Sequence, residues 1–285
     1  MTKPPARWRD LGVRLLSALV MIAVTIAALM GGQIVWGIYV YAIYCVMIWE
    51  LMPLCDPNVA ARHRRALAPL PMLFPLLALG LLVAGLSTPD ETQPPGTAPG
   101  GLFYGGYIAG TIALIAPLIG GLVVLRSGRL LWLAYGAMLA GSALFLAFAY
   151  SEHGVWGLVA LVTIVVISDT SGYFAGRALG GPKFWPAVSP KKTWSGTVAG
   201  WICTALFGAV VLPQFGVPVI AAAGLTFLVC LAAQLGDIAE SAMKRRVEIK
   251  DSSNLIPGHG GFLDRLDALV AAASLAGLIT LVTGG

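Results

Sequence analysis

Charge is scarce in this sequence. Of its 285 residues only 11% are Asp, Glu, Lys or Arg, while 58% are hydrophobic. A soluble domain carries about a quarter charged residues, so the composition excludes a soluble globular protein and predicts an integral membrane protein. The net charge of +5 does not indicate nucleic-acid binding, because no soluble basic domain is present to perform it.

Cysteine is also rare. The four cysteines are Cys45, Cys55, Cys203 and Cys230, and their spacing matches neither a metal-binding nor a redox motif. We interpret them as small buried hydrophobic residues.

Long apolar runs fill most of the chain. Runs of roughly 17–22 apolar residues are long enough to cross a bilayer as helices. The fold class we predict is all-α, a polytopic membrane protein with about nine transmembrane helices. These lie near residues 11–31, 34–52, 67–86, 104–125, 130–150, 154–170, 196–213, 217–236 and 267–283.

The positions of Lys and Arg predict the orientation. If the N-terminus is cytoplasmic, every Lys and Arg falls on the inner side, and the outer loops carry only Asp90, Glu91 and Glu152 as charged residues. This is the positive-inside pattern. It predicts a multi-pass protein of the cell membrane (the inner membrane in a Gram-negative bacterium) with its polar segments on the cytoplasmic face.

The two parts of the chain differ in polarity. Residues 1–150 are predicted to be a transmembrane scaffold, and residues 151–285 a catalytic region. Glu50 is the exception in the first part: it either reaches the interface or faces the bundle interior and pairs with a cation, and the sequence leaves both open.

A first candidate site lies at residues 189–193, Ser-Pro-Lys-Lys-Thr. Ser is a good N-cap and Pro suits the first helical position, so a helix is predicted to begin at Ser189. Lys191 and Lys192 would then lie in its first turn, where the helix dipole disfavours positive charge. A bound phosphate would resolve that conflict; simple positive-inside anchoring is the alternative.

A second candidate site begins with two acids. Asp264 and Asp267 are three residues apart and share one helix face, with Asp237 at the end of the neighbouring span. They could hold Mg²⁺, which takes one or two carboxylates plus substrate phosphate oxygens, and paired metals can clamp a phosphoryl displacement. Asp169 is a further candidate ligand, although acids also simply suit a helix N-terminus.

Basic and glycine-rich residues lie between these acids. The segment 241–267 holds five of the eighteen Lys and Arg residues, and it includes Pro257-Gly258-His259-Gly260-Gly261. Glycines let backbone N–H groups approach a phosphate, although the loop matches neither the Walker nor the dinucleotide motif. His259 could be a general base, a hydrogen-bond donor to phosphate or a loop-packing residue, and we favour the last two. The combination suggests transfer between a nucleotide and a lipid phosphate.

One run carries a more specific pattern: Ser241-x-x-Lys244-Arg245-x4-Lys250-Asp251-x5-Pro257-Gly258-His259-Gly260-Gly261-x-x-Asp264-Arg265-x-Asp267. It resembles that of the phosphatidate cytidylyltransferases, also called CDP-diacylglycerol synthases. Two upstream segments are similar to the family's second block: Asp169-x3-Tyr173-x2-Gly176-Arg177 and Ser189-Pro190-Lys191-Lys192-Thr193. One position departs, because many members have Glu where this chain has Ser195.

The resemblance implies a membrane nucleotidyltransferase of phospholipid biosynthesis. CTP and phosphatidate would give CDP-diacylglycerol and pyrophosphate at a membrane lipid surface. Mg²⁺ would be the cofactor, with a second cation as an option, and the protein would be a homodimer. The phosphate of phosphatidate is already an anion, so catalysis would rest on positioning and charge neutralisation.

The resemblance also implies roles for single residues. The catalytic group is Lys244, Asp264 and Asp267. The metal ligands are Asp169, Asp237, Asp264 and Asp267. The substrate-binding residues are Ser189, Lys191, Lys192, Thr193, Ser241, Arg245, Lys250, His259 and Arg265.

Two other functions were weighed against this one. A cation transporter would need polar residues deep in several spans and an inverted repeat, whereas the polar residues here gather at one membrane face. A lipid kinase or another lipid-phosphate transferase could use the same face, and competition among nucleotides would distinguish it.

Overall fold

The computed structural model describes residues 6–69 and 113–283. The chain divides into two compact units, one of residues 1–20 and 141–285, the other of residues 21–140. Among the described residues, secondary structure is helical apart from one short hairpin and an isolated bridge. The all-α class is confirmed.

Six helices in the described ranges are long and apolar enough to cross a membrane. They are α1 (Ala6–Met30), α2 (Gly32–Cys55), α6 (Arg129–Leu179), α7 (Trp194–Val211), α8 (Val219–Arg246) and α9 (Leu263–Thr283). A short helix, α3 (Ala61–Leu67), follows α2, and a 3₁₀ turn, η1 (Leu212–Phe215), follows α7. These helices make the chain a multi-pass membrane protein.

Helix α6 contains two of the predicted spans, 130–150 and 154–170. Its backbone breaks at Gly154, which has φ 59° and ψ −150°, a conformation that glycine adopts without a steric penalty. The predicted span 67–86 lies almost wholly outside the described residues. Of the span 104–125, Ala113–Val124 is described and forms an apolar helix. The total of nine therefore stays a prediction.

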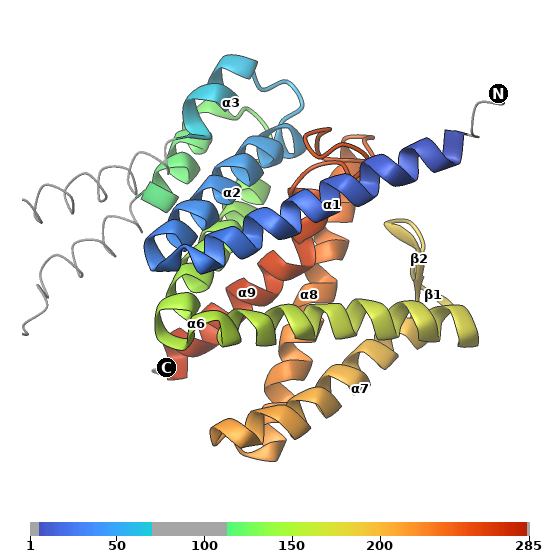
Figure 1. The fold of residues 1–285 in the computed structure, drawn as a ribbon. Coiled ribbons are helices and arrows are strands. Elements are labelled where there is room, and N and C mark those ends of the chain that lie inside the picture. Colours follow the sequence, from blue (N-terminus) through green and yellow to red (C-terminus); the bar gives the residue numbers. More distant parts are fainter. Residues whose placement is uncertain (1–5, 70–112, 284–285) are drawn as a thin grey trace, which may run out of the picture. The chain divides into compact units, whose positions relative to one another are not determined.

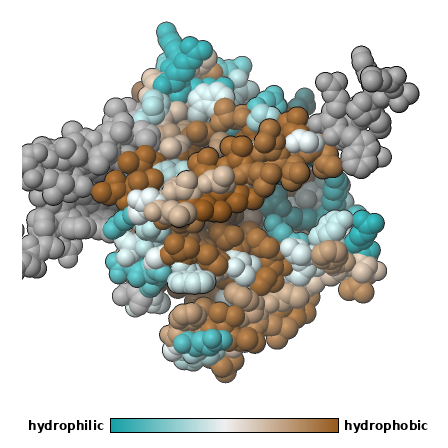
Figure 2. Space-filling view, in the orientation of Figure 1, coloured by the Kyte–Doolittle hydropathy of each residue, from teal (hydrophilic) through white to brown (hydrophobic). Residues whose placement is uncertain are grey.

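Apolar side chains cover the outside of the helices. On α7, Val198, Ile202, Leu206 and Val210 are all exposed at a spacing of four residues, and Figure 2 shows brown surface over α1 and α7. Such a stripe would be costly in water and is stable against lipid.

Within the larger unit, α8 packs against both α7 and α9 (Figure 1). Its apolar core combines residues of α6, α8 and α9, such as Leu161, Ala233 and Ala272. Small residues allow close approach: a Cβ on Gly236 would lie 2.5 Å from the Cβ of Ala271. Small residues at helix crossings are typical of membrane bundles, where packing drives association.

The start of α7 corrects one prediction. No helix begins at Ser189; instead β2 (Ser189–Thr193) pairs antiparallel with β1 (Lys183–Trp185). Thr193 is the N-cap of α7, and its hydroxyl accepts a hydrogen bond from the Gly196 N–H at 3.2 Å. Both Ser189 and Thr193 are good N-caps. Because pairing with β1 keeps residues 189–193 extended, α7 begins after Thr193.

Candidate active site at the α8–α9 contact

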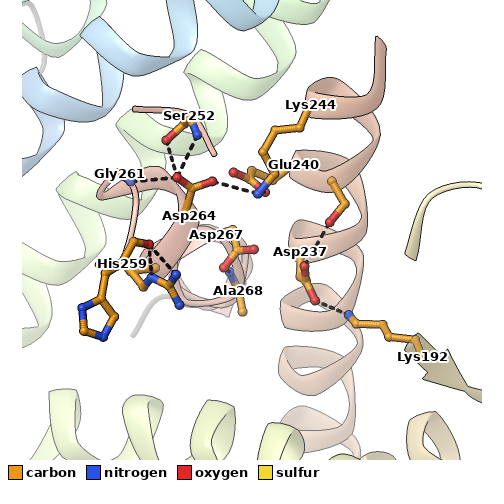
Figure 3. Close-up of polar contacts among 12 residues, drawn as sticks. Lys192, Asp237, Glu240, Lys244, Ser252, His259, Gly261, Asp264, Asp267 and Ala268 are labelled. Carbon is orange, nitrogen blue, oxygen red and sulfur yellow. Dashed lines mark hydrogen bonds and ion pairs between the residues drawn. The ribbon is translucent and has the colours of Figure 1, made fainter. Parts of the chain in front are cut away.

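Two aspartates face each other where α8 and α9 come closest. Asp237 follows Gly236 on α8, and Asp267 lies in the first turns of α9. Their carboxyl groups are near enough for a side-chain hydrogen bond and direct electrostatic interaction, and Figure 3 shows them pointing toward one another. The missing Cβ of Gly236 permits this approach, since it would lie 2.7 Å from the Asp267 carbonyl oxygen.

Other groups hold this pair in place. The Nζ of Lys192 lies 2.5 Å from Asp237 Oδ2, the Ser241 hydroxyl donates to Asp237 Oδ1 at 3.4 Å, and the Ala268 N–H donates to Asp267 Oδ1 at 2.8 Å. A cation from the β1–β2 hairpin thus partly neutralises two adjacent carboxylates.

A second cluster is centred on Lys244 of α8. Its Nζ lies 2.8 Å from Asp264 Oδ1 and also pairs with Glu240, four residues earlier on the same helix. The side chain of Glu240 is fully buried, and that of Asp264 is 3% exposed. An unpaired buried carboxylate costs several kcal/mol, and the one positive charge of Lys244 is shared between these two acids.

Glu240 was not among the residues singled out in the sequence. Two signals could have found it: it lies three residues after Asp237 and four before Lys244, spacings that place all three on one side of a helix. Neither spacing reveals burial, which depends on α9.

Asp264 organises the loop between α8 and α9. Its Oδ2 accepts hydrogen bonds from the Ser252 N–H and hydroxyl, both at 2.8 Å, and from the Gly261 N–H at 2.7 Å. With Lys244 on Oδ1, both of its oxygens are occupied (Figure 3). Asp264 therefore anchors the loop, and its role as a metal ligand stays a prediction.

The glycine-rich loop is closed on itself. The N–H of Ile256 donates to the Gly260 carbonyl at 2.7 Å, and Arg265 donates from Nε to the His259 carbonyl at 2.8 Å. Gly258 and Gly260 have φ of 76° and 93°, in the left-handed region that favours glycine. Arg265 thus holds the loop backbone.

The other predicted site residues lie around this core. Lys191 is exposed on β2, and Arg245 and Lys250 are exposed at and beyond the end of α8. Asp169 on α6 interacts electrostatically with Lys192 and Asp237. The structure therefore brings Asp169, Lys192, Asp237 and Asp267 together. Ser189 and Thr193 belong to the hairpin, where Thr193 caps α7.

Ser195, the departure from the resembled pattern, has a local structural role. Its hydroxyl donates to the Gly180 carbonyl at 2.5 Å and contacts the Thr193 hydroxyl at 3.1 Å. It therefore fastens the first turn of α7 to the end of α6 and does not reach the acidic pair.

The carboxylates of the candidate site can be compared with the ligands that a metal ion requires. Among the residues that the structure describes, no group of three or more His, Cys, Asp or Glu side chains is arranged to hold one. In the described part of the chain, Asp237, Asp267 and the nearby Asp169 nevertheless share one ion-paired lysine, Lys192, which leaves a formal charge of −2 on three carboxylates. Two adjacent carboxylates with this excess charge fit a divalent cation whose remaining ligands come from water or substrate oxygens.

Glu50 belongs to the smaller unit. Its side chain is fully buried. Of the two predicted positions, the membrane interface and the interior of the bundle, the interior is therefore confirmed. Arg64 interacts with it electrostatically and lies 4.0 Å above the ring of Trp49, which fixes α3 against α2.

Comparisons with known proteins agree with the sequence pattern. A sequence model of the Cytidylyltransferase family matches residues 12–282. A phosphatidate cytidylyltransferase of Brucella abortus biovar 1 (strain 9-941) is 42% identical over 180 residues, which are 58% of this chain and 64% of the relative. One of Bacillus subtilis (strain 168) is 35% identical over 121 residues, 42% of this chain and 45% of the relative. One of Staphylococcus aureus (strain COL) is 35% identical over 130 residues, 45% and 50% respectively. The chain thus spans less than two thirds of the length of these curated relatives.

Proposed function

The chain belongs to the Cytidylyltransferase family, and we propose on that basis that it converts CTP and phosphatidate to CDP-diacylglycerol and pyrophosphate. The three relatives named above are phosphatidate cytidylyltransferases. The observation that carries the proposal is the facing pair of Asp237 and Asp267, with its excess negative charge, beside an apolar bundle.

The proposed reaction is a displacement at phosphorus. A phosphate oxygen of phosphatidate forms a bond to the α-phosphorus of CTP, and the bond from that phosphorus to the bridging oxygen of the β-phosphate breaks, releasing pyrophosphate. Both reactants are anions, so the main tasks are positioning and neutralisation of charge.

Mg²⁺ fits the acidic pair as the implied cofactor. Asp237 and Asp267 would hold it, and when bound it would neutralise phosphate charge and fix the geometry of the displacement. Asp169 is near enough to Asp237 to assist. Asp264 contributes by fixing the loop that follows α8, because both of its oxygens are already occupied.

Exposed lysine and arginine side chains bind the phosphate groups of the substrates. Lys244 is only 14% exposed and pairs with two acids, so releasing it would leave buried charges unpaired at a cost of several kcal/mol. We assign phosphate binding instead to Lys191, Arg245 and Lys250, which are exposed. Lys192 can serve either Asp237 or a phosphate.

The finer topology is part of the same proposal. Nine spans with a cytoplasmic N-terminus put the residues of the proposed site, which lie in 151–285, on the cytoplasmic face where CTP is present. Labelling single cysteines with a membrane-impermeant maleimide, one at Lys191 and one at Glu152, tests it: the two should be labelled from opposite sides. The homodimer that the resemblance implies is tested by the mass of the purified protein in detergent.

Activity is tested with the full chain in lipid nanodiscs containing phosphatidate. Radiolabelled CTP and ATP are supplied in parallel with Mg²⁺, and the lipid product is identified. CDP-diacylglycerol from CTP, lost in Asp267→Asn but kept in Glu152→Gln, supports the proposal; Glu152 is an exposed acid outside the acidic cluster. A phosphorylated lipid formed from ATP would identify a kinase instead, and no product with either nucleotide would refute both.

A further inference from the structure

Helix α1 contacts the glycine-rich loop, although 242 residues separate the two groups in sequence. The Ser17 side-chain oxygen lies 2.8 Å from Nδ1 of His259 and 3.0 Å from the Pro257 carbonyl oxygen. Both partners belong to the same compact unit, which includes residues 1–20. The sequence pattern gives no reason to expect this contact.

The contact between α1 and the loop extends over one helical turn, from Arg14 to Ser17. A Cβ on Gly258 would lie 2.8 Å from Cγ of Arg14, one helical turn before Ser17. The loop therefore has glycine at this point for two reasons: its φ of 76° and the side of α1 against it. Any larger residue would push the loop away from Ser17.

The Ser17 hydroxyl has one proton and three acceptors within reach: the carbonyl oxygens of Pro257 and Arg14, each at 3.0 Å, and Nδ1 of His259 at 2.8 Å. When that proton goes to a carbonyl oxygen, the proton between Ser17 and His259 comes from the imidazole, so Nδ1 carries hydrogen and donates to the hydroxyl oxygen. In the neutral ring this leaves Nε2 as the unprotonated nitrogen.

The ring is directed away from the acidic cluster. Figure 3 shows the imidazole of His259 pointing away from Asp264, while its backbone carbonyl accepts from Arg265. The side chain is partly exposed. Its Nε2 can therefore reach a group outside the protein without disturbing Asp237 and Asp267.

We propose that Ser17 is a positioning residue that holds the glycine-rich loop and keeps His259 as the Nδ1–H tautomer, with Nε2 turned outward to accept a hydrogen bond from the P–OH group of a singly ionised phosphate monoester. Resting on the proposed function, this assigns the lipid phosphate, the reactant that is a monoester, to the outer side of the loop. It also makes the first helix a part of the site.

The tautomer can be measured independently of activity. The chain has three histidines, so ¹⁵N-histidine labelling of the protein in nanodiscs gives few signals, and His259→Gln assigns the relevant one. The expected result is a neutral ring with hydrogen on Nδ1 in the native protein and in Ser17→Thr. In Ser17→Ala the ring should shift toward the Nε2–H form; an unchanged tautomer would overturn the proposal.

Turnover is measured on the same samples. Ser17→Ala should lower kcat/KM by about 3- to 10-fold, the effect of losing one uncharged hydrogen bond, mainly through kcat, and Ser17→Thr should restore it. Thr280→Val is the control, because that hydroxyl donates to the Ala276 carbonyl of its own helix at 3.0 Å. A tautomer shift with unchanged kcat/KM would refute the positioning role. Native protein that makes no nucleotide-lipid product would refute the proposed function, while the tautomer result would still decide the Ser17 contact.

Discussion

Removing one charge from the acidic pair should make the protein more stable and inactive. In Asp267→Asn the side chain keeps a carbonyl oxygen for the Ala268 N–H, which now donates to Oδ1 at 2.8 Å. Its new amide N–H can donate to Asp237. A repulsion between two carboxylates is therefore replaced by a hydrogen bond, while the ability to hold a divalent cation is lost.

The size of the effect follows from Coulomb's law. Two unit charges about 4 Å apart repel by about 4 kcal/mol at an effective dielectric constant of about 20. Lys192, 2.5 Å from Asp237, offsets much of this, so we expect a net gain of about 1–2 kcal/mol. For a chain of this size that is a rise in Tm of about 2–3 °C.

The assay is thermal unfolding in detergent followed by the fluorescence of the eight tryptophans, with EDTA and with Mg²⁺. In EDTA the variant should melt above the native protein. Mg²⁺ at ten times its Kd should add about 1.4 kcal/mol to the native protein and nothing to the variant. Glu152→Gln should behave like the native protein in both conditions.

Two results would refute this reasoning. If Asp267→Asn melts below the native protein in EDTA, the two carboxylates do not repel each other in the folded state. If Mg²⁺ stabilises the variant as strongly as the native protein, the cation binds elsewhere.

Two further predictions concern the surroundings of the pair, and a third concerns the smaller unit. Asp264→Ala should cost about 3–5 kcal/mol, because it leaves buried partners of the carboxylate unpaired, and limited proteolysis should then cut within 251–261; resistance to cleavage there would contradict the anchoring role. Lys192→Met should lower the Mg²⁺ concentration for half-maximal stabilisation about fivefold, since one partly exposed charge is worth about 1 kcal/mol, and an unchanged concentration would show that Lys192 does not compete with the cation. Burial would raise the pKa of Asp56, but hydrogen bonds from three backbone N–H groups outweigh burial and hold this pKa below 3.8. The stability that the ionised carboxylate adds is therefore complete above pH 3.8 and is lost as the pH falls further. Asp56→Asn should remove this loss of stability from acid-unfolding curves.

The sequence alone determined the class of the protein and singled out the segments of the proposed site. Scarce charge and long apolar runs require a membrane bundle, because lipid accepts only helices with internally satisfied backbones or closed barrels. Gly236-Asp237 and Asp264 to Asp267 stand out because acids are expensive near a bilayer. Local spacing was enough to put them on helix faces, and the structure then brought α8 and α9 together.

The tertiary structure decided what each residue does there. Thr193 rather than Ser189 begins α7, because a partner strand was needed to choose between two good caps. Glu240 and Asp264 are buried and paired with Lys244 because α9 packs against α8. Ser17 meets His259 across 242 residues, and no local pattern encodes so distant a contact. Helix formation is a local property of the chain, whereas pairing of charges depends on which helices pack together.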